Sequence, residues 1–491
     1  MQSKTMVAES LELAFHPRSI AVVGASGEPL SFGHFFLQHL VNYGYRGQIY
    51  PVTPKWPDIL GHKAYPALKD IPGTVDYVIC CLPAAKVAPL LRECPEKGVR
   101  VVHLFTGRFS ETGREEAADL EEGILRLATE LGVRLLGPNC MGIYNPAEGI
   151  AFGHDFPTEP GRLGMFFQSG GSASEFIYYA SLRGIRFSKV TSYGNALDID
   201  EADILEYLAE DDETDAIAGY VEGIRDGRKF LHALRRTTPK KPVILLKVGR
   251  GSAGAESAAS HTASMAGSFP IWESAVRQAG AVQAQTLADM ADLAVAFYCL
   301  PPIRSTRVGI LGGGGGQSVL SADEWEVAGF DVVPLPDDVE EVIRETLPEL
   351  WWGWIRNPVD QSLLPMEVLG ADLSPEILRR MARSESLDLV VANTAVGGPF
   401  SKAHLAAYVQ QYAEVIIEAG RTGTNPVVAV LDTGALGPNE FDDERWGSLS
   451  EARTRLIAAG IPVYASARRA AGSIHRLVKY HRWRDLRTPS S

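Results

Sequence analysis

A histidine within a run of small residues is the clearest candidate for chemistry in this sequence. His261 lies between Ser260 and Thr262, and residues 249–260 before it are mostly Gly, Ala and Ser. A segment with so little apolar bulk is typical of a mobile loop. Neutral imidazole is available near pH 7, so His261 can act as a nucleophile. For one of 11 histidines, a plain surface residue in a flexible loop is the simpler interpretation.

A carboxylate suited to orient an imidazole follows a strand-like run. Glu222 comes directly after the apolar residues Ile217–Val221. Open α/β sheets bind their ligands at the carboxyl ends of strands, which is where this side chain should lie. Glu222 would hold one ring nitrogen of a histidine and leave the other free to react. A surface salt bridge is the alternative interpretation.

Three glycine-rich turns follow strand-like runs and precede helix-like ones. Such a turn presents backbone N–H groups at the positive end of a helix dipole, which favours anions. The first turn lacks a full GxGxxG pattern and the second lacks the lysine of a P-loop, which counts against NAD and Walker-type nucleotide binding. A tight turn is the alternative for the second, and flexibility without a ligand is the alternative for the third. The candidates are Gly24, Ala25 and Ser26 for a nucleotide-like ligand, and Gln168, Ser169, Gly170, Gly171, Gly313 and Gly314 for phosphate.

An acidic stretch is better explained by helix capping than by metal binding. Residues 194–203 contain four acids, and Asp or Glu near a helix N-terminus caps it and favours its dipole. No ligand spacing typical of a divalent metal is present, so we predict no metal site. The five cysteines form no CxxC pair, which argues against a zinc site or a disulfide framework.

The remaining sequence alternates strand-like and helix-like runs, which predicts doubly wound parallel sheets. The pattern restarts twice, so we expect three consecutive α/β domains: 1–145, Rossmann-like, and 146–302 and 303–484, both flavodoxin-like. The expected strands are 19–24, 47–52, 76–81, 100–105, 133–136, 163–168, 187–192, 217–221, 243–247, 307–311, 387–392, 426–431 and 461–464. The clearest expected helices are 33–42, 84–93, 111–131, 173–182 and 317–328.

Composition excludes several classes of protein. The 491 residues carry a net charge of −13, which disfavours nucleic acid and anionic membranes as partners. No stretch approaches the 18 apolar residues of a transmembrane helix, and residues 1–17 do not read as a signal peptide. We therefore expect a cytoplasmic protein.

Together, these motifs resemble the α subunit of nucleoside-diphosphate-forming acyl-CoA synthetases, the ADP-forming acetate–CoA ligase branch of the succinyl-CoA synthetase superfamily. The resemblance covers nearly the whole chain. It rests on residues 20–26, 50–55, 136–142, 168–170, 194–203, 222–224, 247–250, 260–262 and 357–360.

The resemblance implies a mechanism. Phosphate would convert an acyl-CoA to an acyl phosphate, and His261 would then carry the phosphoryl group on a mobile loop to ADP. Glu222 would hold the imidazole, and helix N-termini at Ser169–Gly170 and near Asn357 would bind the phosphoryl anion. The implied residues for coenzyme A are Gly24, Ala25, Ser26, Val52, Pro54, Lys55, Leu82, Pro83 and Asn139.

The resemblance also implies a partner. In this family an ATP-grasp module binds ATP or ADP with Mg²⁺, and we find no such module in the chain. A separate ATP-grasp β subunit is therefore expected, in an α2β2 assembly, with a small carboxylic acid as substrate. Residues 105–109, 263–265 and 312–316 depart from the family pattern, which suggests an acid larger or more aromatic than acetate. The cluster Trp351–Trp354 would line an acyl pocket, form a subunit interface or simply pack.

Two other functions fit part of the sequence. A non-catalytic CoA-binding or CoA-sensing protein would keep the fold without turnover, but the presence of both His261 and Glu222 argues against it. An NAD-linked oxidoreductase would need a complete dinucleotide fingerprint, which the first turn does not supply. Phosphate labelling of His261 would distinguish a CoA ligase from a non-catalytic CoA-binding protein. A comparison of CoA binding with NAD binding would distinguish it from an oxidoreductase.

Overall fold

The computed structural model contains three main β-sheets, each built largely from parallel strands. It describes residues 2–254, 268–347, 355–361, 373–394, 402–431 and 444–487. The chain divides into two compact units, Met1–Met290 with the first two sheets and Ala291–Ser491 with the third. The predicted α/β fold is confirmed, with three sheets whose strands are parallel apart from β8 in the second. The predicted boundaries after residues 145 and 302 stay predictions.

The first sheet comprises five parallel strands, and a two-stranded hairpin accompanies it. The strands are β1 (Ser19–Val23), β2 (Gln48–Val52), β5 (Tyr77–Cys80), β6 (Val101–Leu104) and β7 (Arg134–Leu136), with the hairpin β3 (Asp58–Ile59) and β4 (His62–Lys63). The helices of this region are α1 (Gln2–Phe15), α2 (Phe32–Asn42), α3 (Val87–Glu93) and α4 (Glu115–Glu130).

The second sheet has six strands, of which β8 runs antiparallel to β10. The strands are β8 (Gly142–Tyr144), β9 (Leu163–Phe167), β10 (Phe187–Ser192), β11 (Ala216–Val221), β12 (Val243–Lys247) and β13 (Val282–Ala284). Its helices are α5 (Gly170–Ser181), α6 (Glu201–Glu210), α7 (Gly227–Thr237) and α9 (Phe269–Ala279), and α10 (Leu287–Cys299) follows.

The third sheet has five parallel strands. They are β14 (Arg307–Leu311), β15 (Asp331–Val332), β16 (Leu389–Thr394), β17 (Val427–Leu431) and β18 (Val463–Tyr464). The helices of this unit are α11 (Gly315–Ala328), α12 (Asp337–Thr346), α14 (Ser374–Met381), α15 (Lys402–Thr422), α16 (Glu444–Ala458) and α17 (Ala467–Asp485).

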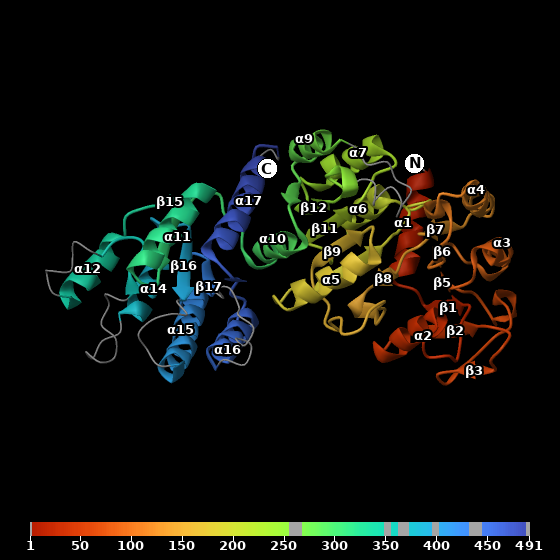
Figure 1. The fold of residues 1–491 in the computed structure, drawn as a ribbon, viewed down its shortest axis with the longest axis horizontal. Helices are drawn as coiled ribbons and strands as arrows, with labels where there is room; N and C mark the ends of the chain where they lie inside the picture. The colour runs from red at the N-terminus through yellow and green to blue at the C-terminus, as the bar shows by residue number, and fades with distance from the viewer. Residues whose placement is uncertain are drawn as a thin grey trace. The chain divides into compact units, whose positions relative to one another are not determined.

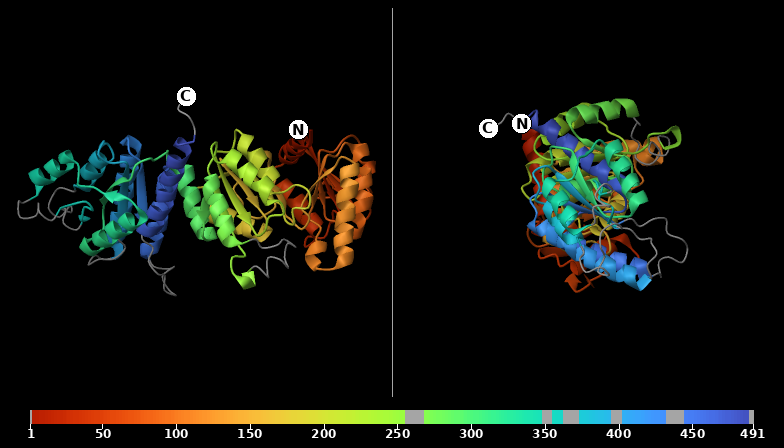
Figure 2. Two further views of the ribbon diagram at one scale, coloured as in Figure 1. Left: turned by 90° about the horizontal axis from the view of Figure 1, so that it is seen from above. Right: turned by 90° about the vertical axis from the view of Figure 1, so that its left-hand side faces the viewer.

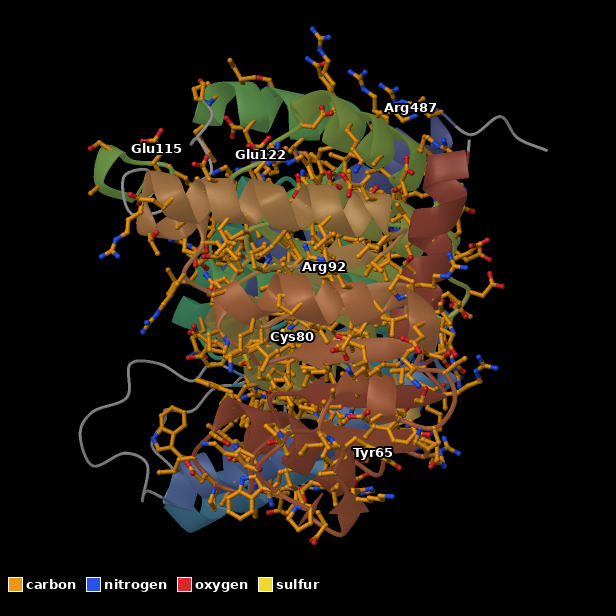
Figure 3. The ribbon with its side chains drawn as sticks, turned by 90° about the vertical axis from the view of Figure 1, so that its right-hand side faces the viewer. Tyr65, Cys80, Arg92, Glu115, Glu122 and Arg487 are labelled. Carbon is orange, nitrogen blue, oxygen red and sulfur yellow. The ribbon has the colours of Figure 1, made fainter. Side chains whose placement is uncertain are left out.

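Helices cover both faces of each sheet (Figures 1 and 2). The central strands are buried along their whole length, which is why they appear in the sequence as continuous apolar runs. On one face of the first sheet, α3 and α4 lie side by side, with Arg92 on α3 and Glu115 and Glu122 on α4 (Figure 3). Beneath them, Val78, Cys80 and their neighbours form a shared apolar core.

The parallel strands of all three sheets share one order. Numbered along the chain within each sheet, they lie in the order 2-1-3-4-5, with β8 added antiparallel at one edge of the second. This order has a switch point between its first and third strands, and open α/β sheets bind ligands outside the carboxyl ends at that point. The switch points lie between β1 and β5, between β9 and β11, and between β14 and β16. The fold therefore marks three places where ligands would bind.

Close packing at the first switch point depends on a glycine in α2. A Cβ on Gly33 would overlap the carbonyl oxygen of Gly24, which is backbone and cannot move aside. Gly33→Ala is therefore expected to lower the free energy of unfolding by about 1–3 kcal/mol. Gly123 within α4 has no atom near the position of its missing Cβ, so Gly123→Ala should raise that free energy by about 0.5–1 kcal/mol. Urea denaturation of both variants checks the opposite signs, and equal effects would contradict the packing argument.

Candidate functional site

The second switch point joins the predicted phosphate turn to the predicted carboxylate. Gln168 directly follows β9, and its side-chain Oε1 accepts hydrogen bonds from the backbone N–H of Glu222, at 2.7 Å, and of Gly223, at 3.1 Å. Its own N–H donates to the carbonyl of Tyr220 in β11. Gln168 is 3% exposed, so these bonds are shielded from water. The sequence predicted that Gln168 binds phosphate, whereas the structure uses its side-chain oxygen to position Glu222.

Glu222 lies where the sequence placed it, directly after β11, but it is not a surface residue. It is 6% exposed, which excludes the interpretation as a surface salt bridge. Its backbone carbonyl accepts a hydrogen bond from Nζ of Lys247 at 2.5 Å. Burial lowers the pKa of Lys247, and the nearby charge of Glu222 opposes that shift. The carboxylate is thus held by a fixed backbone at the carboxyl edge of the sheet.

The helix after Gln168 begins earlier than predicted. The sequence placed residues 169–172 in a turn, but α5 begins at Gly170 and Ser169 is its N-cap. The Ser169 hydroxyl accepts a hydrogen bond from the N–H of Ser172 at 3.2 Å. The first N–H groups of a helix lack partners within it and point out of its N-terminus, which favours an anion. This geometry fits the predicted phosphate site at Ser169, Gly170 and Gly171.

The loop between the first two sheets packs against that helix N-terminus. A Cβ on Gly170 would overlap Cγ of Met141, and the Met141 N–H donates to Oγ of Ser192 at 3.1 Å. Asn139, predicted to contact CoA, has φ of +57° and donates its N–H to the carbonyl of Thr106. The fold therefore brings the neighbourhood of Asn139 from the first sheet next to the phosphate turn of the second.

His261 lies outside the described residues, as does the rest of 255–267. The segments on both sides of that stretch are described and are held by Arg250. Its guanidinium donates to the carbonyls of Lys247 at 2.7 Å and of Ala284 at 3.0 Å, and stacks 4.9 Å from the ring centre of Phe269. Arg250 and Lys247 have no predicted role beyond the motif that contains them, because the contacts with Ala284, Phe269 and Glu222 join residues distant in the chain.

At the first switch point, part of the predicted anion site is corrected. The N–H groups of Gly24 and Ala25 both donate to the carbonyl of Val52, at 3.0 and 3.2 Å, so they are not free for phosphate. Gly24, with φ of +88°, lies against Cys81 and Leu82. The helix after this turn begins only at Phe32, where Ser31 is the N-cap.

The other residues predicted to bind CoA surround this point. Val52 ends β2, and Leu82 and Pro83 follow β5. These two strands flank β1, so the three residues lie at the same edge of the sheet. Ser26, Pro54 and Lys55 lie in the loops after β1 and β2, where Pro54 and Lys55 are exposed. The gathering of these residues at a switch point is the arrangement that a bound nucleotide-like ligand requires.

The third switch point contains the third glycine turn. Gly312 has φ of +112°, and a Cβ there would overlap the carbonyl of Asn393 at the end of β16. Gly313 also has positive φ, and Gly314 is the N-cap of α11. The hydroxyl of Thr394 is buried there and has no hydrogen-bond partner among the described residues. The turn thus combines a backbone conformation that favours glycine with the helix N-terminus expected of an anion site.

The side chain of Asn357 is not available to phosphate. Its amide nitrogen donates to the carbonyls of Val308 at 2.7 Å and Val333 at 2.6 Å, and its oxygen accepts from the N–H of Ile310 at 2.9 Å. These three bonds tie the segment to β14 and the end of β15. Asn357 was predicted to lie near a helix N-terminus that binds phosphate, and its side chain has a structural role here. The cluster Trp351–Trp354 lies outside the described residues.

The acidic stretch caps a helix, as predicted. Asp200 is the N-cap of α6 and accepts hydrogen bonds from the N–H groups of Ala202 and Asp203. Lys229 pairs with both Asp200 and Asp203 at 2.8 Å. Within the described ranges, no group of three His, Cys, Asp or Glu residues could hold a metal ion. Nor does any helix in the part of the chain that the structure describes have the length and apolar character needed to cross a membrane.

Two family models match successive parts of the chain that contain the first two sheets. Residues 18–146 match a CoA binding domain, and residues 160–297 match a succinyl-CoA ligase like flavodoxin domain.

Named relatives match over most of this chain. It is 35% identical over 471 residues to acetate–CoA ligase [ADP-forming] II subunit alpha of Pyrococcus furiosus, covering 96% of this chain and 97% of the relative. It is also 35% identical to acetate–CoA ligase [ADP-forming] I of Archaeoglobus fulgidus, covering 78% of this chain and 54% of that longer protein. Among solved structures, an acetyl-coenzyme A synthetase 1 of Ca. Korarchaeum cryptofilum in complex with phosphate and ADP matches with a TM-score of 0.82 at 29% identity. That match covers 98% of this chain and 100% of the other.

Proposed function

The chain belongs to the family of ADP-forming acetate–CoA ligase α subunits, and we propose that it works through a phosphohistidine at His261. The enzyme interconverts an acid, CoA and ATP with an acyl-CoA, ADP and phosphate. CoA is a substrate and binds the first domain.

The proposed reaction has three reversible steps. In the direction of ATP synthesis, a phosphate oxygen attacks the thioester carbonyl, the C–S bond breaks, and CoA leaves as thiolate. A nitrogen of His261 then attacks the phosphorus of the acyl phosphate, and the acid leaves as carboxylate. Finally, a terminal oxygen of ADP attacks the phosphohistidine, and the P–N bond breaks to give ATP.

The observation that carries this proposal is the pairing across the second switch point. Glu222 is buried, and Gln168 holds its backbone at the carboxyl edge of the sheet, where Ser169 caps α5. A phosphoryl transfer to histidine needs an orienting carboxylate and a preorganised anion site, and both lie here on fixed elements. We assign Glu222 to the imidazole, and the N-terminus of α5 to the phosphoryl group.

The first switch point is the proposed CoA site. Lys55 supplies a positive charge for a phosphate of CoA, while Leu82, Pro83 and Val52 form its less polar floor. The Gly24 and Ala25 amides shape the turn rather than bind the anion, because Val52 already accepts from both. Asn139 lies two residues before Met141, which packs against the phosphate turn, where the thioester end of CoA must reach. Gly313 and Gly314 are proposed as a second anion site.

The chain requires a partner subunit in this proposal. The Pyrococcus relative is named as a subunit, and this chain spans only 54% of the longer Archaeoglobus relative. The rest of that relative lies outside the matched region. We propose an ATP-grasp β subunit that binds ADP and Mg²⁺, in an α2β2 assembly, with a small carboxylic acid as substrate. The division of the chain into domains at 145 and 302 belongs to the same proposal.

Turnover should require both subunits. The purified chain alone is expected to bind CoA but to form no acyl-CoA from acid, CoA and ATP. Addition of the ATP-grasp subunit should restore the reaction, measured as acid-dependent release of ADP. Acyl-CoA formation by the isolated chain at the rate of the mixture would overturn the requirement for a partner. No turnover of any tested acid by the mixture would count against the proposed reaction itself.

A further inference from the structure

An exposed tryptophan lies flat on the first glycine turn. Trp56 follows β2 by four residues, in the loop after that strand, and 39% of its surface is exposed. A Cβ built on Gly27 would lie 3.1–3.2 Å from three atoms of the six-membered ring, Cδ2, Cε2 and Cε3. Nearly equal distances to these three atoms place that Cβ over the ring face. One face of the indole therefore rests on Gly27.

The contact with Trp56 explains why residue 27 is a glycine, which the interpretation of this turn as an anion site does not explain. The φ angle of Gly27 lies outside the left-handed region, so its backbone conformation does not require glycine. Its amide also belongs to a turn whose earlier N–H groups, at Gly24 and Ala25, are already bonded to Val52. What Gly27 provides is room, because a side chain at this position would push against the indole. The glycine at this position of the turn allows the indole of Trp56 to pack against the backbone.

The position of this aromatic platform points to a purine base. Trp56 lies at the carboxyl edge of the first sheet, beside the switch point, in the part of the chain that matches a CoA binding domain. It directly follows Lys55, whose exposed side chain suits a phosphate. A planar ring with one supported face and a cation beside it is the arrangement in which nucleotide bases stack on protein aromatics.

We propose that the adenine ring of CoA stacks on Trp56, and that this contact sets the affinity of the chain for the nucleotide half of CoA. This inference rests on the CoA-binding part of the proposed function. It assigns the adenine to a side chain that neither the motif nor the glycine turn identified. The pantetheine arm then leaves this platform toward Leu82 and Asn139.

The test compares two ligands that differ in the adenosine part. Trp56→Leu, which keeps an apolar side chain but removes the aromatic face, should weaken CoA binding by about 10- to 100-fold. Binding of 4′-phosphopantetheine, which has no adenosine, should change less than twofold. Trp56→Phe should keep most of the CoA affinity. Isothermal titration calorimetry on the full chain measures all of these constants.

A second variant leaves the tryptophan in place. Gly27→Ala introduces a methyl group under the indole, which must tilt, so CoA should bind several-fold more weakly while 4′-phosphopantetheine is unaffected. Equal loss of both ligands in Trp56→Leu would mean that the residue is merely structural, and would overturn the proposal. Unchanged CoA binding in Trp56→Leu would also overturn it. Neither result bears on the proposed reaction, which is measured separately as acyl-CoA formation by the two subunits.

Discussion

His261→Ala is expected to lower the turnover of the two-subunit enzyme by at least about 10³-fold. Alanine has no nucleophile to receive the phosphoryl group, and the acyl phosphate and ADP are bound too far apart, in this mechanism, for direct transfer. CoA binding should be unchanged, because the proposed CoA site belongs to the first sheet. Acid-dependent release of ADP measures the first effect, and titration with CoA measures the second.

A matched histidine separates the loss of a carrier from a general effect. His232 is exposed on α7, and His232→Ala should keep full turnover. With labelled ATP and the partner subunit, the wild type and His232→Ala should acquire an acid-labile phosphate that His261→Ala lacks. If His261→Ala still turned over at a tenth of the wild-type rate, the phosphohistidine mechanism would be wrong.

Strand positions were largely predictable because the central strands are buried on both faces. Phe187–Ser192, Val243–Lys247 and Arg307–Leu311 were predicted with their observed bounds, since each is a short run flanked by polar or turn residues. The strand Gly142–Tyr144 was missed. It has only three residues, and it exists because it pairs antiparallel with Val190–Ser192, far along the chain.

The candidate site was predictable by location but not by the role of each atom. The sequence correctly placed Glu222 at a strand end, because that follows from local pattern and the rule for open sheets. It could not show that the side chain of Gln168 accepts a hydrogen bond from the N–H of Glu222. Nor could it show that the carbonyl of Val52 accepts from the N–H groups of Gly24 and Ala25. These bonds join residues tens of positions apart, and only the register of neighbouring strands brings them together.

Glu222→Ala is expected to lower turnover by about 10²–10⁴-fold. Without the carboxylate, the imidazole of His261 loses the group that fixes its orientation and stabilises its charge during transfer. Glu222→Gln keeps the size and one acceptor oxygen, so it should retain more activity than Glu222→Ala. The rate of histidine phosphorylation in a single turnover measures the effect directly, and CoA affinity should stay constant in both variants. Full activity in Glu222→Ala would remove this residue from the mechanism.

Variants of Gln168 test whether the hydrogen bonds of this residue hold Glu222 in its active position. Gln168→Leu removes the oxygen that accepts from the N–H groups of Glu222 and Gly223, so the carboxylate should shift and turnover should fall by about 10–100-fold. If Gln168 acts through Glu222, adding Gln168→Leu to the Glu222→Ala variant should lower turnover little further. If Gln168 instead binds phosphate, as the sequence alone predicted, the two losses should multiply and the KM for phosphate should rise. The double variant therefore distinguishes a positioning residue from a ligand of the anion, which the two single variants cannot do.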